Sequence, residues 1–302
     1  MKIFDTHPRR AFPGFRTVCV LLCSLQLVAP TSGGQDRAKL ERPVMMDSNG
    51  PGSELYVLDN AGILHSFRVS DNGLSEYGMV SLPTDFKPAD MTFARSEKPA
   101  SMLIAGSQSG RGLVMLFSLD GKALRTWGFQ NVCSGVDSGE ASHAAYVATS
   151  DSNEIYQVDV RGSRSIPIAR IDSATKLGPV AFDEERQEIY VADIAAGKIF
   201  QYAIATRTSK MFVTGLSAPT ALVFDARSHR LFVADPGQRA IFTVDTRATT
   251  PAIVQFASDP LRAPYGMTLI SNGRVAVADY SANSVLVYSE SGSLLFRFPS
   301  GH

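Results

Sequence analysis

The chain has 302 residues, of which 44% are hydrophobic and 19% charged, an ordinary composition for a protein that buries a full core. Its 29 basic and 29 acidic residues balance, and without residues 1–34 the remainder carries 25 basic and 28 acidic groups. A surface with a slightly negative net charge has no field for capturing nucleic acid or anionic lipid, so neither is expected as a partner.

The first 34 residues have the pattern of a secretory signal peptide. Three arginines form a basic region: Arg9, Arg10 and Arg16. The apolar run that follows, 17–29, is too short to span roughly 30 Å of hydrocarbon, and the small residues at 30–34 are typical of a cleavage site. A buried core helix is the alternative interpretation. We therefore expect a signal peptide over 1–34, a short linker over 35–40, and a secreted or periplasmic protein without membrane insertion.

Beyond the linker, six segments repeat one pattern: an apolar strand, a polar turn and a second apolar or aromatic strand. The centres of the first strands are Val57, Ile104, Val147, Val191, Val233 and Val277. Their spacings of 47, 43, 44, 42 and 44 residues are typical of one four-stranded blade per repeat. Each is preceded by a further apolar segment, expected to be the strand nearest the axis, at 42–46, 89–93, 132–136, 178–182, 220–224 and 265–269.

The period predicts an all-β fold, a six-bladed β-propeller of four-stranded antiparallel blades over 41–302. The expected blades are about 41–87, 88–131, 132–176, 177–217, 218–262 and 263–302. One blade has two apolar faces and is unstable alone, so it must stack on both neighbours. Blades 1 and 6 are each contiguous, so closure of the ring should come from packing between their faces, with residues 35–40 as a possible added strand.

The last repeat carries a resemblance to a known family. Pro264 to Asp279, followed by Asn283 to Tyr288, resembles an NHL repeat, and blades 4 and 5 are similar. Blades 2 and 3 depart from the pattern, with Gly106 and Thr149 where the other blades have Asp. The resemblance extends to the YVTN and gluconolactonase-like propellers. It implies a six-bladed propeller that in most NHL proteins binds partners, and it names no ligand.

Four blades end the anchor strand with an aspartate: Asp59, Asp193, Asp235 and Asp279. A short carboxylate at this place can accept backbone N–H bonds in the following turn. We expect this structural role, rather than a ring of catalytic carboxylates.

A metal-dependent lactonase or esterase-like hydrolase is the alternative function. The gluconolactonase-like family holds a divalent cation with a Glu in an opening Glu-Gly-Pro and with Asn or Asp in later Pro-x-Gly motifs, since hard cations need several oxygen ligands. This chain keeps Glu41, but the later positions hold Arg42, Ala89, Val132, Gly178, Thr220 and Tyr265. Glu41 and Asp90 would be the ligands of a Ca or Zn ion in this alternative.

Other catalytic residue sets are sparse. His65, His143 and His229 lie in different blades without metal-ligand spacing, and we expect them at turns or on the surface. Cys133 is the one cysteine outside residues 1–34, and a buried unreactive thiol is the expected state.

We therefore expect an exported, non-catalytic binding module without a cofactor, acting as a monomer. Its ligand would be a protein, a small molecule or a carbohydrate, held by the loop-bearing face, where binding residues vary while blades stay constant. The residues expected at the mouth of the channel are Arg42, Asp90, Thr220 and Tyr265.

Overall fold

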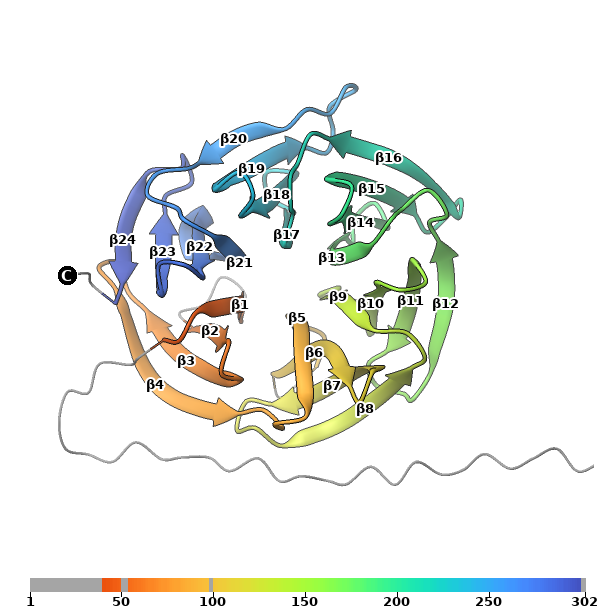
Figure 1. Cartoon of the computed structure of the whole chain (residues 1–302), viewed down its shortest axis with the longest axis horizontal. Coiled ribbons are helices and arrows are strands. Elements are labelled where there is room, and N and C mark those ends of the chain that lie inside the picture. The colour runs from red at the N-terminus through yellow and green to blue at the C-terminus, as the bar shows by residue number, and fades with distance from the viewer. Residues whose placement is uncertain (1–39, 50–53, 98–99, 300–302) are drawn as a thin grey trace, which may run out of the picture.

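The computed structural model describes residues 40–49, 54–97 and 100–299, and within them it shows six antiparallel sheets of four strands around an axis (Figure 1). Blade 1 has β1 (Pro43–Ser48), β2 (Glu54–Asp59), β3 (Ile63–Val69) and β4 (Leu74–Ser81). Blade 2 has β5 (Phe86–Ala94), β6 (Ser101–Gln108), β7 (Arg111–Ser118) and β8 (Ala123–Phe129). Blade 3 has β9 (Cys133–Ser138), β10 (Ala144–Thr149), β11 (Glu154–Asp159) and β12 (Ser165–Arg170).

Blade 4 has β13 (Leu177–Asp183), β14 (Glu188–Asp193), β15 (Lys198–Ala203) and β16 (Thr208–Thr214). Blade 5 has β17 (Ala221–Asp225), β18 (Arg230–Asp235), β19 (Ala240–Asp245) and β20 (Val254–Ala257). Blade 6 has β21 (Pro264–Ile270), β22 (Arg274–Asp279), β23 (Ser284–Tyr288) and β24 (Leu294–Phe298). A 3-10 turn, Ser271–Gly273, joins β21 to β22. The predicted six-bladed propeller of four-stranded blades is confirmed.

The innermost strands differ from the sequence expectation at their ends. β5 begins at Phe86, two residues before the boundary expected between blades 1 and 2, because a bulge between Pro88 and Asp90 lets the strand continue. β1 and β9 run past residues 46 and 136 to Ser48 and Ser138. Asp47 and Asp137 therefore belong to inner strands rather than to the turns that follow.

The core consists of apolar layers between neighbouring blades, as the alternation of side chains along each strand requires. Between blades 2 and 3, for example, Leu103 and Val114 pack with Val147, and Trp127 of β8 joins this layer at 2% exposure. Each blade thus buries both of its faces, so its stability depends on both neighbours.

Closure of the ring follows the expected route. Each sheet holds four consecutive strands, and blades 1 and 6 meet through one apolar cluster that includes Leu55 and Val57 from β2 and Val285 and Val287 from β23. Leu40 is 4% exposed and joins this cluster. The predicted signal peptide, and the linker apart from Leu40, lie outside the described residues.

The anchor-strand aspartates have the predicted structural role. Asp193 accepts backbone N–H bonds from Ala195 and Ala196 in its own turn, and from Thr175 and Lys176 in the loop that enters blade 4. Asp235 and Asp279 do the same in blades 5 and 6. The carboxylate therefore ties the turn of one blade to the incoming loop. In the described part of the chain no helix is long and apolar enough to cross a membrane.

Candidate functional site

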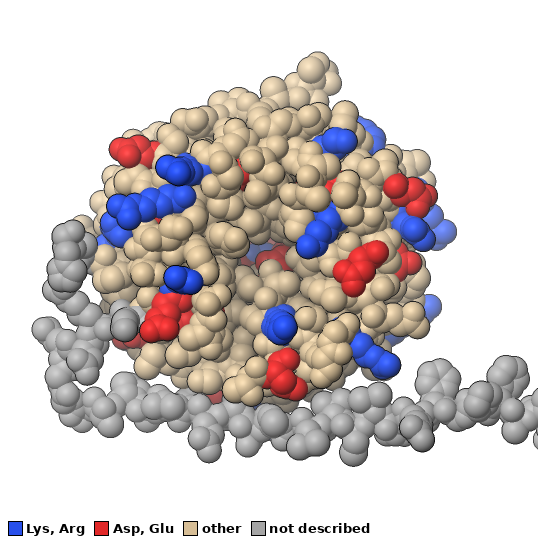
Figure 2. Space-filling model, in the orientation of Figure 1, with Lys and Arg blue, Asp and Glu red and all other residues tan. Residues whose placement is uncertain are grey.

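A cavity of about 1250 Å³ lies on the propeller axis and is lined by the innermost strands of all six blades. Figure 2 shows the face of the ring hollowed at its centre, with both acidic and basic surface inside the hollow. A volume of this size is sufficient for a small organic molecule, since typical ligand pockets measure roughly 300 to 1,000 Å³.

One side of the cavity carries a polar arc from blades 1, 2 and 3, and a hydrogen bond extends it to the buried Thr268 of blade 6. Thr268 Oγ1 donates to Asp47 Oδ1 at 2.9 Å. Thr92 Oγ1 lies 3.3 Å from Asp47 Oδ2 and 3.1 Å from Asp137 Oδ1, so its one hydroxyl hydrogen can serve either carboxylate. These four residues occupy the same level of the inner strands. Each one follows the inner-strand residue that pairs with the central residue of the second strand of its blade, such as Val57 in blade 1.

The carboxylates of this arc also link the inner strands of neighbouring blades. Asp47 accepts the backbone N–H of Phe93 in blade 2 at 2.8 Å, and Asp137 accepts that of Phe182 in blade 4 at 2.8 Å. Arg95, just after β5, lies 3.4 Å from Asp47 and 3.9 Å from Asp137. Burial raises the pKa of Asp137, and the Arg95 guanidinium and the Phe182 N–H oppose that rise.

Asp90 lies two residues before Thr92 on β5, and its carboxyl makes fewer hydrogen bonds than that of Asp47. Its Oδ1 accepts the N–H of Met91 at 2.9 Å, and its Oδ2 accepts the N–H of Val136 in blade 3 at 3.0 Å. Burial inside the ring raises the pKa of Asp90 to about 8, although the two N–H bonds oppose the rise and the charges of Asp137 and Asp47 add to it. A carboxyl so perturbed, in a cavity, is a candidate functional group.

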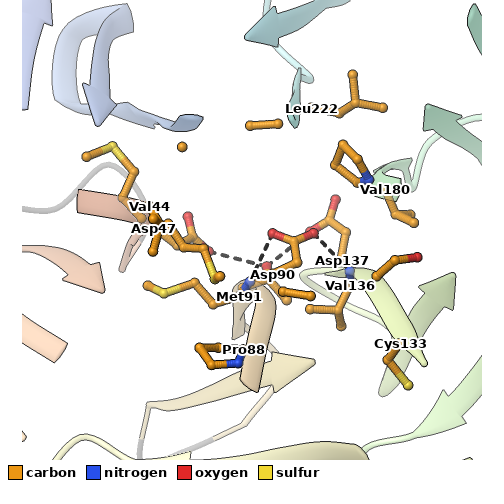
Figure 3. A pocket seen from close by; sticks show the side chains of 18 of the residues that line it. Val44, Asp47, Pro88, Asp90, Met91, Cys133, Val136, Asp137, Val180 and Leu222 are labelled. Atoms are coloured by element: carbon orange, nitrogen blue, oxygen red, sulfur yellow. Dashed lines mark hydrogen bonds between the residues drawn. The ribbon is translucent and has the colours of Figure 1, made fainter. Parts of the chain in front are cut away.

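The inner strands of blades 4 and 5 present an apolar wall to the cavity, with the charged lining residues Lys176, Glu184 and Glu185 just beyond the two ends of β13. Pro179 and Val180 of blade 4 and Leu222 and Val223 of blade 5 form this wall, and Figure 3 shows Leu222 across the channel from Asp90 and Val180 beside Asp137. Cys133 also borders the cavity, but it is fully buried and free, and burial raises the pKa of its thiol to about 12. The expected burial of this thiol is confirmed.

The residues expected at the mouth are brought together only in part. The Arg42 guanidinium lies over the Tyr280 ring, 5.3 Å from its centroid, and the Tyr265 ring contacts the same tyrosine at 5.1 Å. Thr220 Oγ1 donates to the carbonyl of Tyr265 at 2.9 Å. Thr220, Tyr265 and Asp90 line the cavity, but Asp90 bonds to blade 3 and lies apart from the other three.

The two expected ligands of a metal ion are also separated. Asp90 lines the cavity, whereas Glu41 is exposed outside its lining, with its main-chain carbonyl bonded to the N–H of Asn60. Among the described residues, no group of three or more His, Cys, Asp or Glu side chains is arranged to hold a metal ion.

The expectation that the histidines lie at turns or on the surface is wrong for His65. This side chain is 2% exposed within blade 1, with Nδ1 2.6 Å from Glu76 Oε1 and Nε2 3.2 Å from Asp59 Oδ2. His229 does lie in a turn, with φ of 54°, and the His143 side chain is 40% exposed.

The polar arc was missed in the sequence because its aspartates follow the apolar runs of the inner strands. A polar residue after such a run resembles the start of a turn. The available signal was periodicity, since Asp47 and Asp137 both stand ten residues before their anchors, Val57 and Val147.

The fold and cavity define a six-bladed propeller with a two-sided axial channel. No family model and no curated protein matches the sequence. Among solved structures, a chain of a nidogen–laminin complex matches with a TM-score of 0.66 and 14% identity over 79% of this chain and 90% of that one. A Bacteroides thetaiotaomicron protein of unknown function matches with 0.67 and 12% over 87% and 72%. Virginiamycin B lyase from Staphylococcus aureus matches with 0.62 and 13% over 92% and 89%.

At these identities the likeness concerns the fold. It supports the propeller fold that the repeats predicted. The neighbours differ in what their titles describe, a complex with laminin in one case and a lyase in another, so function is argued from the cavity.

Proposed function

We propose that this chain is an exported binding module that holds a small amphipathic molecule in its axial cavity. The observation that supports the proposal is the division of the cavity wall. At the levels of Asp90 and Asp47, carboxylates, hydroxyls and one guanidinium line the inner strands of blades 1 to 3, and proline, valine and leucine side chains line those of blades 4 and 5. The charged side chains of Lys87, Lys176, Glu184 and Glu185 belong to the lining further along the strands. Apolar walls with a few placed polar groups are typical of small-molecule sites.

Export and a monomeric state complete the proposal. Export is supported by the basic region and apolar run of residues 1–34, which precede the first blade. A monomer is in keeping with a ring in which blades 1 and 6 bury each other's faces. The cluster of Arg42, Tyr265 and Tyr280, of which Tyr265 lines the cavity, would offer a protein or carbohydrate a further contact, because arginine and tyrosine are frequent binding residues.

The proposal is tested by a thermal-shift screen of the purified protein against cationic, neutral and anionic amphipathic molecules. A compound present at about 100 times its Kd adds about 2.7 kcal/mol of stability, which corresponds to a rise in Tm of several degrees. We expect such a rise for a restricted chemical class. If no compound raises the Tm, the cavity is not a small-molecule site.

The same screen addresses the alternative, a Ca- or Zn-dependent hydrolase with Glu41 and Asp90 as ligands. That function predicts a rise in Tm with millimolar calcium or zinc and turnover of lactones. Neither a shift nor turnover is expected here, because Glu41 lies outside the lining of the cavity that Asp90 faces.

A further inference from the structure

Asp90 differs in charge from the residues at the same level of the other inner strands. Pairing with the second strands puts Met45, Asp90, Gly135, Ala221 and Gly266 at one level of the inner strands, and Pro179, which precedes the paired Val180, takes this place in blade 4. Asp90 is thus the one charged side chain among them. Across the ring, in blade 5, stands Ala221, and the apolar wall of Pro179, Val180 and Leu222 lies beside it.

Asp90 also keeps capacity for further hydrogen bonds. A carboxylate has about four acceptor sites. The Asp90 carboxylate accepts two hydrogen bonds, from the backbone N–H groups of Met91 and Val136. The Asp47 carboxylate accepts five, from the backbone N–H groups of Ser48 and Phe93 and from the side chains of Thr92, Thr268 and Arg95. Within the described residues no lysine, arginine or histidine forms an ion pair with Asp90. Figure 3 shows its carboxyl turned toward the open channel.

We propose that Asp90 is the residue that selects and orients the ligand, and that the ligand is a cationic amine on an apolar body. The ammonium group would bind the Asp90 carboxylate, and the apolar body would lie against Pro179, Val180 and Leu222. The inference rests on the proposed function, since it presumes that the cavity binds a small molecule.

The charges around the cavity favour a cation over an anion. Asp47 from β1 and Asp137 from β9 face Asp90, and Arg95 is the one guanidinium close to them. The positive charge of that guanidinium is already balanced by the carboxylates of Asp47 and Asp137, which leaves the surroundings of Asp90 net negative. The rest of the described lining carries Asp59, Glu140, Glu184 and Glu185 against Lys87 and Lys176, so acidic groups outnumber basic ones. A buried charge needs a partner, which an ammonium group supplies and an alcohol does not.

Binding of an amine should depend on pH in a defined direction. Burial raises the pKa of Asp90 to about 8, so at pH 6 the carboxyl carries a proton that an ammonium group must displace. Affinity should therefore rise with pH, by up to about tenfold per unit, and level off above pH 8 while the amine stays charged.

The test uses three probes of equal chain length that differ in the end group: 4-phenylbutylamine, 4-phenylbutanol and 4-phenylbutyrate. Their affinities are measured by isothermal titration calorimetry between pH 6 and pH 9. At pH 9 the amine should bind at least about tenfold more tightly than the alcohol or the acid. Asp90→Asn should remove this preference and the pH dependence. Asp172→Asn, a matched change at an 85% exposed aspartate, should keep both.

A second measurement needs no variant. In buffers of different ionisation enthalpy at pH 7, the wild-type protein should release close to one proton for each amine bound. Equal affinity of the amine for wild type and Asp90→Asn, or the absence of proton release, overturns the inference. If the alcohol or the acid binds and Asp90→Asn has no effect, the cavity remains a small-molecule site and the role of Asp90 is refuted. If no probe binds, the amine assignment is refuted as well.

Discussion

His65 is held between two carboxylates in the interior of blade 1. Burial alone would lower its pKa, but the bonds to Asp59 and Glu76 outweigh burial and raise the pKa of His65 to about 9. The protonated imidazole therefore joins β2, β3 and β4 through side chains. Sequence patterns did not reveal this triad, because a bulge between Ser66 and Phe67 sets the register that brings Glu76 to His65.

The triad predicts a pH-dependent loss of stability. The folded-state pKa lies above the ordinary 6.5, so the stabilisation is complete below pH 6.5 and is lost as pH rises through 9. Between pH 6.5 and pH 9.5 the wild type should lose on the order of 3 kcal/mol more than His65→Gln, which cannot titrate. Urea unfolding at both pH values measures the difference.

His143→Gln is the control for this prediction, because the His143 side chain is 40% exposed. It should keep the pH dependence of the wild type. The same pH dependence in His65→Gln and the wild type would contradict the assigned role.

At the scale of the element, neighbouring inner strands pack so closely at two positions that only glycine fits there. A Cβ on Gly135 of β9 would contact the carbonyl oxygen of Gly178 in blade 4 and stand 3.0 Å from the Cα of Pro179. Glycine is therefore required where β9 and β13 meet. Gly266 of β21 has the same role against β1, where its Cβ would meet the carbonyl oxygen of Val44 at 2.7 Å.

Gly135→Ala should accordingly destabilise the protein by about 1 to 3 kcal/mol, the usual cost of overpacking, since backbone atoms of β13 cannot yield as a flexible side chain can. Gly128→Ala in β8 is the matched control, because a Cβ there meets no atom within 4 Å. Chemical denaturation of the two variants compares them. Equal midpoints would show that the inner strands move apart at little cost.

The strands of a blade differ in how well the sequence predicts them. The second and third strands were found because their apolar runs repeat at a nearly constant period, and burial of both faces enforces that pattern in every blade. The ends of the inner strands were not found, since Asp47 and Asp137 satisfy their carboxylates with N–H groups of the next blade. Such partners lie about 45 residues away and leave no local pattern.

At the scale of the whole molecule, six similar repeats build a channel that is not symmetric. The outer parts of the blades share one packing scheme, whereas the level of Asp47 holds Asp47, Thr92, Asp137, Ala181, Val223 and Thr268. Closure by the apolar faces of blades 1 and 6 requires no such difference. Packing of the blades therefore does not account for the asymmetry of the inner strands, whereas binding of a ligand in the channel would account for it.

The most direct test of a ligand in the channel is to fill the channel and measure binding. Ala221→Trp places an indole at the wall opposite Asp90, and Leu124→Trp places one on the outer strand β8, where Leu124 is 46% exposed. For the strongest compound of the thermal-shift screen, titration calorimetry should show at least about tenfold weaker binding to a cooperatively folded Ala221→Trp. Leu124→Trp should bind as the wild type does. Unchanged affinity in a folded Ala221→Trp would contradict the account, because the ligand would then bind elsewhere on the propeller.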